Sequence, residues 1–185
     1  MASEIVLVRT GVANVASVEA AFRRLGVSLG ATDDPRVVHD AHALVLPGVG
    51  AFGAGMERLR AAGLDAPRIA RIVEGRPTLA VCLGLQLLAR TSEETPGQAG
   101  LGVVPTGVSR LRGAPRLPHF GWNRVEPGAE CELLAPGYAY FANAYRLVAA
   151  PAGWAAAFAD HGGRFVAAVE RGPVLACQFH PELSG

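Results

Sequence analysis

The chain has 185 residues, a net charge of +1 and 50% hydrophobic residues. This length fits one domain with one core, and the balanced charge excludes the basic stripe that nucleic-acid binding requires. No apolar run approaches the roughly 18 to 20 residues of a membrane span, and residues 1–4 lead directly into an apolar run without a signal peptide. We therefore expect a cytoplasmic protein with no nucleic-acid or membrane partner.

The cysteines and basic residues exclude several cofactor chemistries. Cys82, Cys131 and Cys177 are odd in number and show no CxxC spacing, which argues against a disulfide framework and against a zinc site. All 17 basic residues are arginine, so these residues contain no Schiff-base lysine and no P-loop lysine. We expect neither a metal nor a cofactor.

Short aliphatic runs alternate with helical patterns in the first half of the chain. Residues 4–9 (EIVLVR) predict a buried strand, and Asn14 is expected to cap a helix with Val18, Phe22 and Leu25 on one face. Further strands are expected at 26–31, 43–47 and 77–81, with helices around 56–62 and 66–74. This alternation predicts an open α/β fold, a mainly parallel, doubly wound sheet with helices on both faces.

From about residue 103 the pattern changes to strands and turns. Strands are expected within 103–111, 138–145, 154–170 and 174–179, with a hairpin turn at His161, Gly162 and Gly163. These strands predict an antiparallel extension of the parallel sheet. No repeat and no long linker divides the sequence, so residues 1–185 are expected to form a single domain.

A glycine pattern after the third expected strand resembles a dinucleotide fingerprint. Gly48, Gly50 and Gly53 spell G-x-G-x-x-G. The fingerprint normally follows the first strand of its unit, however, and needs an acidic residue at the end of the next strand. Glu74 has the distance but precedes that strand. A tight turn is the simpler interpretation, and its exposed amides could stabilise an oxyanion.

Cys82 follows the strand at 77–81 and precedes the helical stretch LGLQLLAR. A turn from strand to helix places a side chain at the carboxyl end of a sheet and at a helix N-terminus, where a thiolate is favoured. Ala80 and Gly84 are small enough for such a crowded turn. The alternative is a packed core cysteine, the commoner fate of a free cysteine.

His180 follows the last strand, and Pro181 fixes the turn after it. Glu182 could hold the imidazole in one tautomer, as a triad carboxylate does. Taken alone, a histidine here would more often be a surface loop residue than a catalytic base. Cys82, the glycine turn and His180 nevertheless all follow strands, and ligands of open α/β sheets bind outside the carboxyl ends of the strands. The agreement favours a nucleophile and its base.

Three segments resemble the motifs of the class I (triad) glutamine amidotransferases, a flavodoxin-like α/β family. They are residues 82–86 (CLGLQ), 47–50 (PGVG) and 178–182 (QFHPE), and the resemblance runs from the first strand to residue 185. It implies glutamine as the substrate, with Cys82 as the nucleophile, His180 as the base and Glu182 as its orienting carboxylate. Ala80 departs from the family pattern, which usually has glycine there.

The same resemblance implies the residues around the substrate. The backbone amides of Val49 and Leu83 would form the oxyanion hole. The remaining family positions that contact glutamine correspond to Gly48, Gly50, Gln86, Glu94, Asn143, Ala144 and Tyr145. Asn143 stands where a histidine is frequent.

Within the family, residues 118–123 (PHFGWN) and 140–145 are similar to the glutaminase subunits of imidazole glycerol phosphate synthases. That similarity implies a heterodimer with a (β/α)₈ cyclase subunit that receives the ammonia. Residues at or near the interface would be Asn14, His119, Trp122, Asn123 and Tyr140. Such glutaminases normally continue with a C-terminal helix that this chain lacks, so lower stability or stronger dependence on the partner is expected.

Other functions share parts of this pattern. A glutaminase that serves another synthase would have the same triad, a silent interaction subunit would have Cys82 merely packed, and a simple cysteine hydrolase would not need Gln86. Trp122 and Tyr140 could also be ordinary packing residues. The segment PHFGWN favours the synthase subunit.

Overall fold

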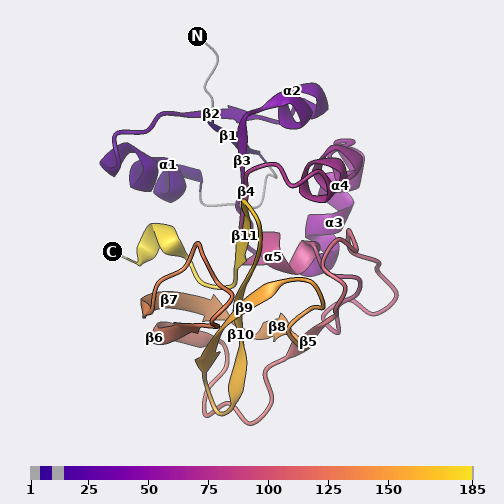
Figure 1. Cartoon of the computed structure of the whole chain (residues 1–185). Coiled ribbons are helices and arrows are strands. Elements are labelled where there is room, and N and C mark those ends of the chain that lie inside the picture. Colours follow the sequence, from indigo (N-terminus) through magenta and orange to yellow (C-terminus); the bar gives the residue numbers. More distant parts are fainter. Residues whose placement is uncertain (1–4, 10–14, 185) are drawn as a thin grey trace.

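The computed structural model describes residues 5–9 and 15–184. Five parallel strands form the upper part of the sheet in Figure 1. Their order is β2 (Leu29–Thr32), β1 (Ile5–Val8), β3 (Ala43–Leu46), β4 (Thr78–Val81) and β11 (Val174–Cys177). The first four follow the 2-1-3-4 order of flavodoxin-like sheets. The expected mainly parallel, doubly wound sheet is confirmed.

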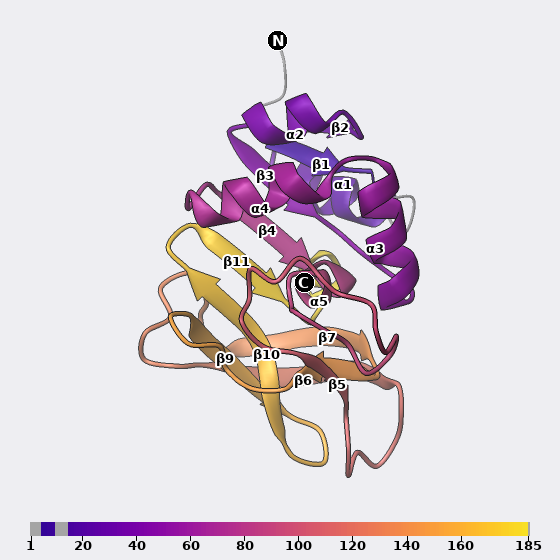
Figure 2. The same ribbon diagram turned by 90° about the vertical axis from the view of Figure 1, so that its right-hand side faces the viewer.

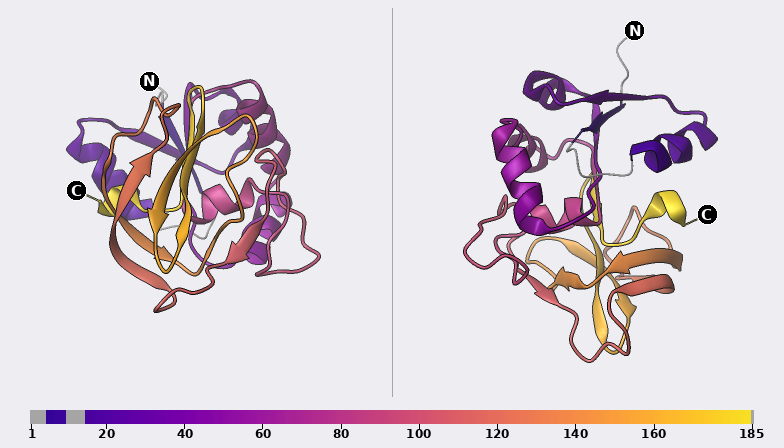
Figure 3. Two further views of the ribbon diagram at one scale, coloured as in Figure 1. Left: turned by 60° about the horizontal axis from the view of Figure 1, so that its bottom comes forward. Right: turned by 180° about the vertical axis from the view of Figure 1, so that it is seen from behind.

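Helices cover both faces of the parallel strands because their side chains alternate between two cores. Val6 and Val8 of β1 pack in one core with α2 (Pro35–Asp40), α3 (Phe52–Ala61) and α4 (Asp65–Val73), whereas Leu7 packs with Val18 of α1 (Val15–Arg24) on the opposite face. Figure 2 shows α2, α3 and α4 in front of the sheet, and the right panel of Figure 3, where the parallel strands are seen edge-on, shows α1 on the side opposite to α3 and α4.

The antiparallel extension continues from β11. β10 (Arg164–Arg171), β9 (Ala155–Asp160), β6 (His119–Pro127) and β7 (Gly137–Asn143) follow in that order, and β8 (Tyr145–Leu147) joins β10 to β5 (Val108–Arg110). All strands of the described residues thus belong to one sheet. The hairpin at residues 161–163 is confirmed, and the single domain over residues 1–185 stays a prediction.

Several elements differ from the sequence-based expectation. The helix expected to include Leu25 ends at Arg24, because Gly26 (φ +74°) closes it with hydrogen bonds from Gly26 N to Arg23 O and from Val27 N to Phe22 O. Leu25 is therefore 77% exposed. The strand expected at 103–111 is limited to β5, and α2 and β6 were not predicted. Asn14, the expected cap, lies outside the described residues. None of the helices described is long and apolar enough to cross a bilayer.

Two glycines allow the turn after β3 to pack against α5 (Leu83–Leu87). A Cβ atom on Gly84 would lie 2.3 Å from the carbonyl oxygen of Leu46, and one on Gly48 would lie 2.9 Å from the Gly84 nitrogen. Both neighbours are backbone atoms that cannot turn aside. The absence of side chains at these positions therefore sets the distance between the two segments.

Replacement of Gly84 by alanine is expected to lower the free energy of unfolding by about 3 kcal/mol, because the methyl group forces β3 and α5 apart. Chemical denaturation measures the change. Gly137→Ala is the matched control, since a Cβ there meets nothing within 4 Å. Equal stability of the two variants would show that the close approach is dispensable.

Candidate active site

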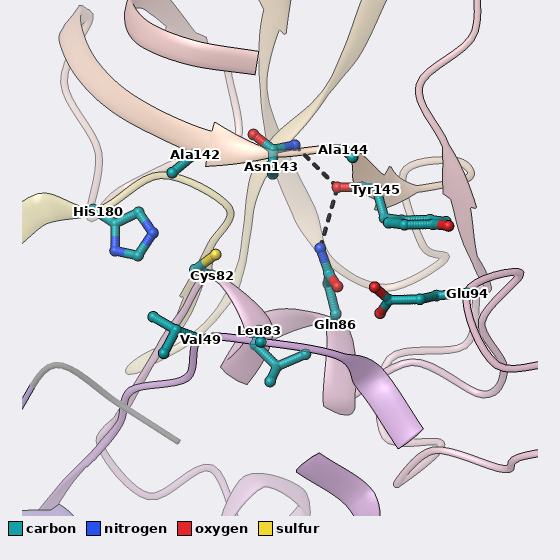
Figure 4. A pocket seen from close by; sticks show the side chains of 11 residues that line it. Val49, Cys82, Leu83, Gln86, Glu94, Ala142, Asn143, Ala144, Tyr145 and His180 are labelled. Atoms are coloured by element: carbon teal, nitrogen blue, oxygen red, sulfur yellow. Dashed lines mark hydrogen bonds between the residues drawn. The ribbon is translucent and has the colours of Figure 1, made fainter. Parts of the chain in front are cut away.

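The carboxyl ends of β3, β4 and β11 lie side by side, because these strands are parallel neighbours. The segments that follow them meet at a cavity of about 270 Å³. It is lined by Val49, Gly50, Cys82, Leu83, Gln86, Glu94, Ala142, Asn143, Ala144, Tyr145 and His180 (Figure 4). Every expected substrate-contacting residue except Gly48 lines this cavity, and Ala142 is the lining residue that sequence reasoning missed.

Cys82 occupies a sharp turn between β4 and α5. Its backbone has φ 53° and ψ −109°, and it is the one non-glycine residue with positive φ in the described part of the chain. Its amide donates to the Cys177 carbonyl at 2.7 Å, which fixes the turn against β11. The expected strand-turn-helix elbow is confirmed. A strained backbone held by its neighbours commonly marks a functional position.

His180 lies beside Cys82 and lines the same cavity (Figure 4). Its Nδ1 is 2.8 Å from Oε1 of Glu182, and each side chain is only 7% exposed. Burial alone would lower the pKa of His180, but hydrogen bonds to Cys82 and Glu182 and their negative charges outweigh it and raise the pKa to about 10. The imidazolium is therefore the favoured form at neutral pH, paired with Cys82 on one side and Glu182 on the other.

The glycine turn after β3 already forms a hydrogen bond with one of the two expected oxyanion donors, the Leu83 amide. The Leu83 amide donates to the carbonyl of Gly48 at 3.2 Å. The Val49 amide belongs to the same peptide plane as that carbonyl and is directed the opposite way. The Val49 N–H therefore points away from Leu83. Gly50 has φ +97°, a conformation that glycine adopts without strain.

The substrate-side residues form a hydrogen-bonded wall. The amide nitrogens of Gln86 and Asn143 both donate to the Tyr145 carbonyl, at 3.1 and 3.0 Å (Figure 4). Glu94 also lines the cavity, near Gln86 and Tyr145 (Figure 4), and its Oε2 accepts from the Phe52 amide at the first residue of α3, at 2.7 Å. Glu94 thus also fixes the start of α3, which sequence reasoning did not foresee.

The residues expected at a partner interface divide into two groups because β6 and β7 alternate. Trp122 and Tyr140 lie opposite each other on the outer face, whereas His119 and Asn123 face inward. His119 is 4% exposed, and Asn123 donates to the Asp160 carbonyl at 2.6 Å. The interface role of these two residues stays a prediction. Asn14 lies outside the described residues.

His119 belongs to a stack of aromatic rings on the inner face of β6 and β7. Its ring lies 3.9 Å from that of His161 and 4.9 Å from that of Phe141. Burial and the neighbouring His161 lower the pKa of His119 to about 4, so the stacked ring is neutral at pH 7.

The remaining motif residues have structural surroundings. Cys177 lies inside β11, and burial raises its pKa well above the usual value, while Cys131 lies in a loop. Gly53 falls within α3 and Glu74 follows α4, before β4 begins. This arrangement agrees with a tight turn and not with a dinucleotide fingerprint. Residues 5–9 and 15–184 contain no group of three or more His, Cys, Asp or Glu that could hold a metal.

A model of the glutamine amidotransferase class-I family matches residues 11–185. The chain belongs to this family. Among named relatives, the imidazole glycerol phosphate synthase subunit HisH of Symbiobacterium thermophilum is 43% identical over 98% of this chain and 88% of its own length. The chloroplastic synthase hisHF of Arabidopsis thaliana is 37% identical over 99% of this chain, which corresponds to 32% of the plant protein.

Solved structures agree with this family membership. A crystal structure described as a glutamine amidotransferase has a TM-score of 0.78 and 26% identity, and covers 96% of this chain and 90% of its own. The glutaminase domain of Trypanosoma brucei CTPS with bound acivicin, at 19% identity, shares the fold with a TM-score of 0.69. The amidotransferase is therefore a glutamine-hydrolysing enzyme with the class I fold.

The pair of His180 and Glu182 makes a titration prediction for this amidotransferase. We expect His180 to remain protonated until the pH approaches about 10, and Glu182→Gln to lower that pKa by about 1 to 2 units, because a neutral amide no longer attracts the imidazolium. The folded-state pKa lies above 6.5, so this pairing stabilises the fold fully below pH 6.5 and ceases to do so as the pH rises through about 10. NMR titration of the imidazole, assigned with His180→Gln, measures both values.

Glu57→Gln is the control for that titration, because it removes an exposed carboxylate from α3. It should leave the His180 titration unchanged. A wild-type His180 that titrates near 6.5 would contradict the assignment of an imidazolium.

Proposed function

We propose that this amidotransferase is the glutaminase subunit of an imidazole glycerol phosphate synthase, and that Cys82, His180 and Glu182 are its catalytic residues. The observation that carries the proposal is that Cys82 and His180 line one cavity, with Glu182 hydrogen-bonded to Nδ1 of His180. The names of the HisH relatives support the choice of synthase.

The proposed reaction proceeds through a thioester. The Cys82 thiolate attacks the side-chain amide carbon of glutamine, and the resulting tetrahedral intermediate collapses as the carbon–nitrogen bond breaks. His180, already protonated, gives its proton to the departing nitrogen, which leaves as ammonia. It then takes a proton from a water molecule that attacks the thioester, and glutamate and the thiolate are released. Glu182 holds Nδ1 and thereby directs Nε2 to the reacting atoms.

The oxyanion hole requires one rearrangement of the glycine turn. Rotation of the peptide between Gly48 and Val49 by about half a turn would remove the Gly48 carbonyl from the Leu83 amide and direct the Val49 amide into the site. A single rotation therefore supplies both donors, each worth roughly 10²-fold or more in rate. Glycine at positions 48 and 50 lowers the barrier to such a change. We propose that partner binding promotes it.

The substrate is proposed to occupy the cavity next to Cys82. Glu94 would attract the ammonium group of glutamine, and Gln86 would bind its polar end groups. The wall formed by Asn143, Ala144 and Tyr145 would close the other side, and Gly50 would approach from the turn. Each of these residues lines the cavity.

An aromatic surface beside the cavity suits a partner subunit. Phe120, Trp122 and Tyr138 are 67%, 55% and 66% exposed on the outer face of the β6–β7 hairpin, and Tyr140 stacks edge-on against Trp122. Exposed aromatic clusters of this kind mark protein interfaces. The hairpin also touches the triad, because the His180 amide donates to the Tyr140 carbonyl at 2.8 Å. We propose that the cyclase (β/α)₈ barrel docks here and receives the ammonia.

Glutamate release from glutamine tests the proposed reaction. We expect slow hydrolysis by the isolated chain, strong stimulation by the cyclase subunit with its ligand bound, and a loss of at least about 10³-fold in Cys82→Ala. Cys131→Ala, a change in a surface loop, is the matched control. Activity of Cys82→Ala equal to that of an active wild type would show that Cys82 is not the nucleophile, and no glutamate release by the wild type with the cyclase subunit present would indicate a silent subunit. Full activity of the isolated wild type that the cyclase does not change would contradict the proposed oxyanion rearrangement.

Docking is tested at Trp122. Its replacement by alanine should weaken binding of the cyclase subunit about tenfold or more, because a large exposed aromatic side chain at the centre of an interface contributes strongly to affinity. Calorimetric titration gives the dissociation constant, and circular dichroism verifies the fold. Val73→Ala removes an exposed apolar side chain from α4 and should leave the affinity unchanged. Unchanged affinity in both variants would place the interface elsewhere.

A further inference from the structure

Gln178 is a fully buried polar residue next to Cys82, and the reaction proposed above does not use it. Its Oε1 accepts from the Gln86 side-chain nitrogen at 2.9 Å, and its Nε2 donates to Cys82 Sγ at 3.6 Å. Gln86 is itself 6% exposed and lines the cavity. A chain of buried amides therefore connects the cavity wall to the sulfur.

The direction of this chain is fixed by a backbone carbonyl. The Tyr145 oxygen can only accept, so the Gln86 side chain must present its nitrogen there (Figure 4). The same nitrogen faces Gln178, which must therefore present its oxygen to Gln86. The remaining group of Gln178, its nitrogen, is then the one that faces Cys82. Reversal of either amide would set two donors or two acceptors against each other.

From this geometry we infer that Gln178 is a positioning residue that donates a hydrogen bond to the Cys82 thiolate and holds it for attack. The inference rests on the proposed function, because only a reactive sulfur needs such a donor. A buried amide N–H requires an acceptor, and a thiolate accepts more strongly than a thiol. Gln178 thus favours the charged sulfur without competing with His180 for the proton.

The charged and titratable groups around Cys82 do not fill the role of a neutral hydrogen-bond donor to the sulfur. His180 and Glu182 follow β11, and Cys177 within β11 is neutral because burial raises its pKa. Arg24 of α1 donates to the backbone carbonyl of Glu182 at 3.3 Å. Glu94, across the cavity, binds the start of α3. Gln178 is accordingly a neutral donor beside an ion pair.

Two substitutions separate donation from packing. In Gln178→Glu, the carboxylate still accepts from Gln86 but cannot donate to sulfur and adds a negative charge beside it. Gln178→Met keeps the side-chain length and removes both polar groups. Gln98→Glu makes the same chemical change in a loop outside the cavity lining and serves as the control.

The measurement is the rate of Cys82 alkylation by iodoacetamide as a function of pH, located by mass spectrometry, together with thermal midpoints. We expect the midpoint of the Gln178→Glu profile to lie about one pH unit or more above wild type, with about tenfold slower alkylation at neutral pH. Gln178→Met should shift in the same direction by less. A purely structural role would lower the thermal midpoint and leave the alkylation profile in place.

If the alkylation profiles of both Gln178 variants matched that of the wild type, the inference about Gln178 would be overturned and the proposed function would be unaffected. If Gln178→Glu does not fold, the profile of Gln178→Met decides. A wild-type chain that neither alkylates selectively at Cys82 nor releases glutamate would contradict the proposed function, and the inference with it.

Discussion

The site depends on the close approach between the turn after β3 and the first residues of α5. Gly84 faces the Leu46 carbonyl where no Cβ fits, and Gly48 faces the Gly84 amide in return. This contact places the turn beside Cys82, whose positive φ is itself imposed by the step from β4 into α5. A side chain at either glycine would move the turn away from Cys82. Packing at two backbone positions thereby determines whether the proposed oxyanion donors lie beside Cys82.

The antiparallel extension carries the second constraint. β7 reaches the triad through three hydrogen bonds: His180 N to Tyr140 O, Tyr140 N to Ser184 Oγ, and Ser184 Oγ to His180 O at 2.6 Å. The inner face of the same hairpin is anchored by the neutral stack of His119, whose protonation would place a charge among Phe141 and Phe165. A partner bound to the outer face would therefore be connected to His180 through these hydrogen bonds.

The sequence predicted the parts of the molecule that follow from local pattern. The five parallel strands, the elbow at Cys82 and the place of His180 after β11 each come from an apolar run followed by a turn. The segment 118–123 matches a family motif, which does not by itself predict a strand, and β6 is therefore absent from the prediction. In the structure, the alternation of inward and outward residues along β6 separates His119 from Trp122. The engagement of Leu83 with Gly48 and the capping of α3 by Glu94 could not be predicted, because both join residues that lie 35 and 42 positions apart.

Gln178 illustrates how a long-range network gives a local motif its chemistry. Gln178 and His180 are two residues apart, a spacing that in extended chain places both on one side, and both contact Cys82. The orientation of the Gln178 amide, however, is set by the Tyr145 carbonyl, which belongs to a different strand and already binds Asn143. A substrate that binds Gln86 would therefore be connected to the sulfur through two hydrogen bonds, from Gln86 to Gln178 and from Gln178 to Cys82. The cavity wall and Cys82 are parts of one polar network, in which a change at one end alters the acceptor at the other.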